Sequence, residues 1–294
     1  MAKLIRRTLL FVVIPVLLFY AYLLWINNRT QPMPAATQLD QAREQAIGWL
    51  LDNHNRIVDE TNDMLWRMIQ QAGEVSGDPR LLSLFADYEN AHLKHNHRSI
   101  WRPLFYPGSW SGVRPEDIAG LPYYNQHFIY AISCDSDLGN IESIAAQNHP
   151  DFCDTYPLKP ACVTHQLMGI RLMQRIECGS APELAATVSA LQDRIVRQLT
   201  FDPRVVDIYL QRVLMLTESG ASDRVKPVWL ARVLEAQLAD GGWSGFQPLI
   251  PLGEDKQTLG FAQKGIGIGT AHSNFHATAQ GVLLLTLLTH NASP

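Results

Sequence analysis

The sequence predicts an all-α protein with a transmembrane helix at its N-terminus. Three observations support this class: an uncharged apolar run near the N-terminus, apolar residues at helical spacing through most of the chain, and no alternation of apolar and polar residues over four or more positions. Short turns join most segments, which favours antiparallel helical hairpins. The 294 residues are 47% hydrophobic, enough for a large core. The net charge of −4, without a basic stripe, argues against nucleic acid as a partner.

The N-terminal segment is expected to cross a lipid bilayer. Lys3, Arg6 and Arg7 precede an uncharged run over 8–27, close to the roughly 20 residues that a spanning helix needs. Aromatic residues suited to the membrane interface lie late in the run, at Tyr20, Tyr22 and Trp25. The basic flank predicts a single-pass protein of the inner (cytoplasmic) membrane, with its N-terminus inside and its main domain in the periplasm or outside. A cleaved signal peptide is the alternative, but its apolar region is usually only about 7–15 residues long.

The chain divides into an anchor at 1–28, a polar linker at 29–38 and one all-α domain at 39–294. Spacing and start or stop signals predict the domain's helices in order. They are expected at 40–69 as one or two helices, 80–98, 122–132, 138–148, 163–178, 180–199, from Asp202-Pro203 to before Gly220, from Ser222 or Asp223 to Leu238, and 274–288.

Four cysteines lie close together in a domain expected in an oxidising compartment, so two disulfides are predicted. Of the three possible pairings, we favour Cys153–Cys162, which closes a small Pro-containing loop, and Cys134–Cys178, which ties two flanking helices. A zinc-thiolate site is the rival, although none of the spacings is CxxC.

Two loops stand out. Ser99–Leu121 contains several Pro, Gly and aromatic residues, and so long a loop in a compact domain favours a functional cover. Leu259–Thr270 is rich in glycine but lacks the Lys-Ser/Thr ending of a P-loop, so we expect a flexible lip rather than a nucleotide site.

The C-terminal third carries a resemblance to a known group of folds. Val233–Trp243 has the spacing apolar-x-x-x-Gln-x-x-x-Gly-Gly-Trp, and Phe275-His276-Ala277-Thr278 opens the last helix. The first resembles the QW-type repeat of terpenoid cyclases and the Gly-Gly-Phe/Trp turn of protein prenyltransferases. The second is similar to the His-Thr helix start of the prenyltransferase β subunit, whose His binds zinc.

The resemblance implies an α/α-toroid, in which inner and outer helices alternate around a ring. Val163–Met173 resembles a second inner helix of this type. The chemistry of those families is not implied, because no Asp-x-Cys pair lies between the two motifs and Asp135-Ser136-Asp137-Leu138 lacks the last acid of the cyclase Asp-x-Asp-Asp motif. In a toroid, inner-helix starts and long loops line a bowl at one end, where N-terminal N–H groups favour anionic or polyol ligands.

Residues expected at this bowl define the candidate site. The spacing Asn125-x-His127-x-x-Tyr130 resembles a segment of α/α-toroid lyases, in which Asn neutralises a uronate carboxylate and His or Tyr moves the proton. His165 and His276 would meet if both helices line the bowl. The catalytic candidates are therefore His127, Tyr130, His165 and His276. Candidates for substrate binding are Asn125, Arg102, Arg171, Trp110 and Trp243.

Three functional hypotheses follow. The first is an enzyme of lyase or hydrolase type that acts on an envelope glycan or polymer. The second is a non-catalytic scaffold or assembly subunit that docks envelope proteins. The third is an enzyme with a divalent metal on His272 and His276, which are four residues apart and could share one helix face; His272 in a loop is the alternative.

Overall fold

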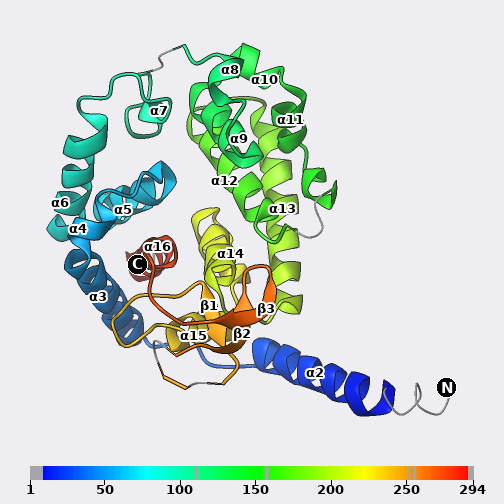
Figure 1. The fold of residues 1–294 in the computed structure, drawn as a ribbon. Helices are drawn as coiled ribbons and strands as arrows, with labels where there is room; N and C mark the ends of the chain where they lie inside the picture. Colours follow the sequence, from blue (N-terminus) through cyan, green and yellow to red (C-terminus); the bar gives the residue numbers. More distant parts are fainter. Residues whose placement is uncertain (1–8, 110–111, 156–158, 251, 254–255, 291–294) are drawn as a thin grey trace.

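The computed structural model describes residues 9–109, 112–155, 159–250, 252–253 and 256–290 (Figure 1). The chain is mostly helical, with one small sheet. The α-helices are α2 (Ile14–Asn28), α3 (Ala36–Asp52), α4 (His54–Ile57), α5 (Asp63–Ser76), α6 (Pro79–Tyr88), α7 (Arg102–Phe105), α8 (Pro115–Ile118), α9 (Tyr123–Ser133), α10 (Ser136–Gly139), α11 (Glu142–Ala145), α12 (Cys162–Arg175), α13 (Ala181–Phe201), α14 (Asp207–Glu218), α15 (Pro227–Glu235) and α16 (Phe275–His290).

The N-terminal helix is joined to the domain. Within the described residues, one helix is long and apolar enough to cross a membrane, the 19-residue stretch Leu10–Asn28 with a mean hydropathy of 2.2. At its end, the buried Asn27 donates to the Leu199 carbonyl at 2.5 Å and accepts from the Tyr209 hydroxyl at 2.8 Å. The Arg232 guanidinium also donates to Asn27. The end of α2 is therefore part of the domain core.

Five helices from distant parts of the chain form a row (Figure 1). Helix α9 packs against α12, α12 against α14, α14 against α16, and α16 against α5. Other helices lie along this row: α13 packs on α12 and α14, α3 on α16, and α6 on α5. The largest core cluster runs through all of these elements, so burial of apolar surface holds the row together.

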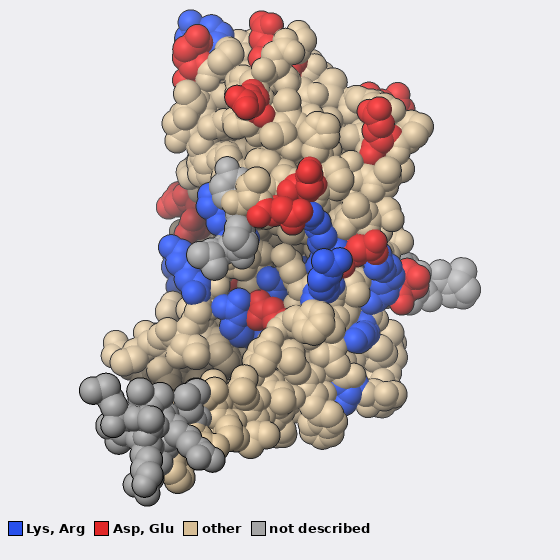
Figure 2. All heavy atoms as spheres, turned by 90° about the vertical axis from the view of Figure 1, so that its right-hand side faces the viewer, with Lys and Arg blue, Asp and Glu red and all other residues tan. Residues whose placement is uncertain are grey.

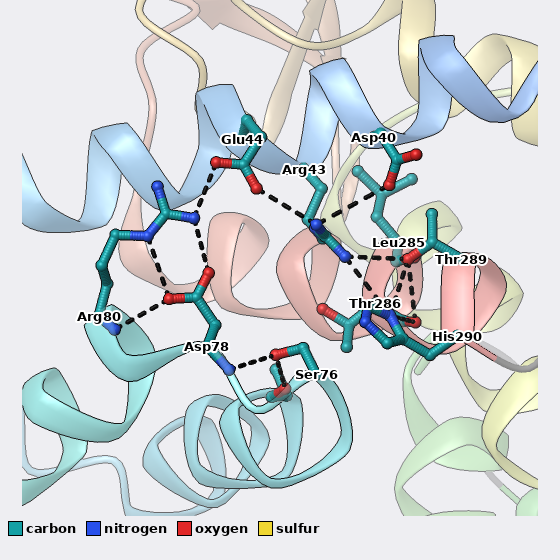
Figure 3. Close-up of polar contacts among 11 residues, drawn as sticks. Asp40, Arg43, Glu44, Ser76, Asp78, Arg80, Leu285, Thr286, Thr289 and His290 are labelled. Carbon is teal, nitrogen blue, oxygen red and sulfur yellow. Dashed lines mark hydrogen bonds and ion pairs between the residues drawn. The ribbon is translucent and has the colours of Figure 1, made fainter.

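A polar network ties the end of α16 to α3 and α6 (Figure 3). Arg43 on α3 donates to the Thr289 hydroxyl at 3.1 Å and pairs with Glu44 at 3.2 Å. Glu44 also pairs with Arg80 at 2.7 Å, and Arg80 in turn binds Asp78, the N-cap of α6. Helices α3 and α16 are thus fixed side by side.

The expectation of no strands is wrong. A three-stranded antiparallel sheet has the order β1 (Phe246–Pro248), β2 (Thr258–Ala262), β3 (Gly265–Gly269). Gly260 pairs with Gly267, and a Cβ on Gly260 would lie 2.3 Å from the Phe246 ring. The Gly-rich stretch at 259–270 therefore forms a hairpin, because the sheet needs glycine for this close approach.

Several helix boundaries also differ from expectation. The helix expected at 138–148 is broken into α10, α11 and a 3₁₀ turn, and the one expected to 98 leaves α-helical geometry after Tyr88. Helix α14 starts at Asp207 rather than at Asp202, because the Asp202 carboxylate binds Arg204 at 2.6 Å and Arg212 at 2.9 Å. Helix α15 starts at Pro227, which supplies the first helical position.

Both disulfides are confirmed. Cys134–Cys178 joins the residue that follows α9 to the turn after α12, and Cys153–Cys162 closes the short loop before α12. No free cysteine remains in the chain. The zinc-thiolate alternative is therefore excluded.

Candidate functional site

The first turns of the five helices in the row converge on one cavity of about 570 Å³. Asp63 opens α5, Asn125 lies in the first turn of α9, and His165 in that of α12. Asp207 is the first residue of α14, and His276 the second of α16. Further lining comes from Glu60, Thr61, Asn62, Met64, Leu65, Met68, Trp101, Tyr124, Phe128, Met168, Gln211, Gln263 and Gln280.

His165 is the histidine most deeply placed in this cavity. Its ring stacks on Tyr124 with centroids 4.3 Å apart and contacts Phe128 edge-on at 6.1 Å. Burial lowers the pKa of His165 to about 4, with a smaller contribution from His276. Within the described chain, neither ring nitrogen has a hydrogen-bond partner. The imidazole is therefore neutral near pH 7 and available to hydrogen-bond a hydroxyl group.

A carboxylate and an imidazole face each other on the neighbouring helices. Asp207 Oδ2 lies 3.4 Å from His276 Nδ1. The Gln280 side-chain nitrogen, one helical turn after His276, lies 3.1 Å from the same ring nitrogen. Nδ1 either donates to the Asp207 carboxylate or accepts from the Gln280 amide, depending on the tautomer, and either hydrogen bond orients the His276 ring beside Asp207.

Asp63 faces the cavity from α5. The Tyr88 hydroxyl donates to its Oδ1 at 2.9 Å, and Tyr88 itself is held by stacking on Trp66 at 4.4 Å. Burial raises the pKa of Asp63 to about 6, against the smaller opposing effect of the Tyr88 hydrogen bond. The carboxyl group thus keeps its proton at a pH where an exposed Asp would have lost it.

The rest of the lining suits a neutral, hydroxyl-rich ligand. Amide groups line the cavity at Asn62, Asn125, Gln211, Gln263 and Gln280, and aromatic rings at Trp101 and Tyr124. The Gln211 amide oxygen accepts from the Thr164 hydroxyl at 2.7 Å, which orients that amide. No Lys or Arg side chain is among the described lining residues, so the cavity carries no cation for an anionic group.

His127 and Tyr130 do not join His165 and His276. His127 is fully buried on another face of α9, with Nε2 3.0 Å from Asn148 Oδ1 and with Nδ1 against Gly169. Tyr130 points toward α10, where a Cβ on Gly139 would lie 2.8 Å from its ring. Both side chains sit on the packed side of α9, and neither lines the cavity that holds His165 and His276.

The candidate arginines lie elsewhere. Arg102 donates to the Leu93 carbonyl at 2.7 Å and covers the Tyr106 ring. Arg171 lines a second cavity of about 400 Å³, where its Nε lies 3.6 Å from Glu218 Oε2. Neither can hold an anionic group in the first cavity.

The remaining candidates are also separated from the cavity. Trp243 is buried; its ring N–H donates to the Val233 carbonyl at 2.8 Å, and its backbone N–H donates to the Thr278 hydroxyl. It links α15 to α16 instead of contacting solvent. His272 is exposed in the loop before α16, off the helix face that carries His276. Trp110 lies outside the described residues.

The described residues contain no group of three or more His, Cys, Asp or Glu side chains placed to hold a metal ion. The cavity instead brings together two imidazoles and two carboxyl groups from four separate helices, with a third carboxyl group, that of Glu60, in the loop before α5. Sequence reasoning missed Asp63 and Asp207, although both are acids at helix starts, the kind of position expected to line the bowl.

Neither a protein-family model, nor a curated protein, nor a solved structure matches this chain. A functional assignment therefore rests on the geometry of the cavity.

Proposed function

We propose that this protein is a membrane-anchored extracytoplasmic hydrolase that cleaves a glycosidic bond in an uncharged stretch of envelope glycan. The observation that carries the proposal is that Asp63 and Asp207, on two different helices, line one cavity in environments that differ. Two carboxyl groups with separate roles are what glycoside hydrolysis requires.

The chemistry divides between the two acids. Asp63 keeps a proton up to about pH 6 and donates it to the departing glycosidic oxygen. Asp207 accepts a proton from the water that attacks the anomeric carbon, while His276 steadies its carboxylate. One water is consumed, one C–O bond breaks, and the two acids exchange their protonation states before solvent restores them. His165 binds a sugar hydroxyl beside the reacting centre.

The lining favours neutral sugars over uronates. Amide side chains hydrogen-bond hydroxyl groups, and Trp101 and Tyr124 offer apolar ring faces on which sugar rings pack. The lyase hypothesis needs His127 or Tyr130 to move a proton beside Asn125, and of these three residues only Asn125 lines the cavity. Hydrolysis therefore fits this cavity better than elimination.

Two features of the whole chain belong to the proposal. We infer that α2 is a retained anchor, because its loss would leave the buried Tyr209 hydroxyl and Arg232 without Asn27. The basic residues before it favour an inner-membrane protein with its N-terminus inside, and two disulfides suit a domain outside the cytoplasm. The row of inner helices covered by outer ones supports an α/α-toroid arrangement.

The test uses the purified full chain in detergent. It is incubated with a panel of neutral and acidic envelope glycans, and new reducing ends are measured together with ultraviolet absorbance from unsaturated products. We expect reducing ends without unsaturated products. Asp63→Asn should lower the rate by about 10²–10⁴-fold, and Asp207→Asn should do likewise. Asp137→Asn, an exposed carboxyl on α10, is the matched control.

Retention of full activity in Asp63→Asn and Asp207→Asn would overturn the proposal. So would failure to release reducing ends from every glycan tested. In that case the non-catalytic assembly role, with the helical domain as a docking surface, becomes the better account.

A further inference from the structure

An exposed apolar ledge lies beside the membrane helix. It consists of Phe201 at the end of α13 and Leu259, Ile266 and Ile268 on the hairpin, with side chains 60%, 49%, 66% and 76% exposed. Leu259 and Ile268 are paired across β2 and β3, so the two side chains share one sheet face. Large apolar side chains this exposed on adjoining elements mark an interaction surface.

The ledge is continuous with α2. The Tyr20 hydroxyl donates to the Phe201 carbonyl at 2.7 Å. Leu23 packs against the small core cluster that contains Phe261, which lies between Leu259 and the hairpin turn. Arg204, three residues after Phe201, donates to the carbonyls of that turn at 3.3 Å. Helix α2, the end of α13 and the hairpin therefore form one connected surface.

The length of α2 places this surface relative to a bilayer. The 19 residues Leu10–Asn28 span about 28 Å at 1.5 Å per residue, which roughly equals the ~30 Å hydrocarbon core. Leu10–Tyr20 alone would cover only about 15 Å, half of that thickness. For α2 to span the bilayer, the residues after Tyr20 must also be in lipid. The contact between Tyr20 and Phe201, about 12 Å before the end of α2, therefore lies within the outer half of the membrane.

The charge distribution agrees with this placement. Figure 2 shows the face from which α2 projects: Lys, Arg, Asp and Glu gather across its middle, and the part below, at the level of α2, is almost free of charge. An uncharged surface bordered by charged residues is typical of a membrane boundary.

We propose that the apolar ledge inserts into the outer leaflet of the bilayer beside α2, so that the domain is partly embedded as well as tethered. This rests on the proposed anchoring by α2. The partner is the lipid acyl chain region itself. Insertion fixes the orientation of the domain, because a helix and a hairpin together define two lines of contact with the membrane.

The experiment places one cysteine at a time for a thiol-reactive fluorophore in the full chain, reconstituted in vesicles of phosphatidylcholine and phosphatidylglycerol. Ile268→Cys and Phe201→Cys report on the ledge. Leu17→Cys reports on α2, and Glu183→Cys, at the opposite end of α13 from Phe201, reports on the aqueous side. Mass spectrometry confirms a single label and two intact disulfides. Quenching by aqueous iodide is compared with quenching by a nitroxide on the lipid acyl chain.

We expect labels at 268 and 201 to be quenched by the lipid nitroxide as strongly as at 17, and several-fold less by iodide than at 183. If iodide quenches the labels at 201 and 268 while the lipid nitroxide quenches the label at 17, the ledge does not insert but α2 is still an anchor. Shielding of the ledge from both quenchers would mean a protein partner covers it, and would also overturn the inference. Absence of lipid quenching at 17 would refute the anchoring itself.

Discussion

At the residue scale, the cavity holds two groups whose pKa values are moved in opposite directions by the same cause. Burial raises the pKa of Asp63 to about 6 and lowers that of His165 to about 4. Burial disfavours the charged form of each, so the carboxyl group holds its proton to a higher pH and the imidazole stays neutral. We expect kcat/KM for glycan hydrolysis to fall as the pH rises above about 6, because Asp63 loses its proton. A pH–rate profile measures this; an unchanged rate up to pH 9 would exclude Asp63 as the acid.

His127 has a structural role with its own pH signature. Burial lowers its pKa from 6.5 to about 4, so the unfolded chain binds the proton more readily. Its contribution to stability is complete above pH 6.5 and is lost as the pH falls toward 4, by roughly 3 kcal/mol at most. His127→Gln should flatten the fall in the free energy of unfolding over this range, measured by urea titration. The exposed His272→Gln should leave the slope unchanged; equal slopes in both variants would contradict this account.

Gly169 leaves the space that the His127 ring occupies. A Cβ there would lie 2.2 Å from Nδ1, inside a fully buried contact. Gly169→Ala should therefore destabilise the fold by about 1–3 kcal/mol, because the ring cannot move away without losing Asn148. Gly48→Ala on α3 is the matched control: nothing lies within 4 Å of its Cβ, and alanine favours the helix by about 1 kcal/mol. Equal melting temperatures for the two variants would show that the close contact is absent.

At the element scale, the two disulfides differ in the length of chain they close. Cys134–Cys178 joins residues that are 44 positions apart in the sequence, and Cys153–Cys162 joins residues that are nine positions apart. Loop-closure entropy predicts losses of about 4 and about 3 kcal/mol when each pair is changed to alanine. Urea midpoints of the two double variants measure the difference. A larger loss from the Cys153/Cys162 pair would mean that local geometry outweighs the entropy of the unfolded chain.

The elements also show what sequence patterns can and cannot predict. The spacing of Gln237 and Trp243 predicted a turn that ties helix ends together, and the two residues do connect α15, α16 and α3: the Gln237 amide donates to the Ala42 carbonyl at 2.8 Å, and the Trp243 ring N–H donates to the Val233 carbonyl. The hairpin was missed, since glycines at Gly265, Gly267 and Gly269 hide the period-two pattern of the two isoleucines between them. The need for glycine in this hairpin comes from tertiary packing, a close approach to the Phe246 ring that no local sequence pattern reveals.

At the scale of the whole molecule, the sequence predicted that helix starts line a cavity, but it did not predict which residues line it. His165, His276 and Asn125 reach the cavity because they lie in first turns on the inner side of their helices. His127 is two residues from Asn125 and faces the other way, a rotation that depends on how α9 packs against α12. Asp63 and Asp207 were overlooked because the expected helices, over 40–69 and from Asp202, placed both acids inside a helix, whereas the structure starts α5 and α14 at these residues.

The proposed anchor helix α2 also contributes to the stability of the domain. Asn27 sits at its end, fully buried, and accepts from Tyr209 and Arg232 while donating to Leu199. Asn27→Ala removes the acceptor of the Tyr209 hydroxyl and one of the two acceptors of Arg232, and should cost about 1–3 kcal/mol, lowering the melting temperature in detergent. The exposed Asn55→Ala is the control.

The same reasoning predicts that the protein in membranes keeps its N-terminal segment. A chain cut after α2 would lose every contact made by Asn27, so we expect peptides from α2 in the protein isolated from membranes, detected by mass spectrometry. A mature form that lacks α2, with the melting temperature of the full chain, would contradict both the anchor and the role of Asn27 in the core.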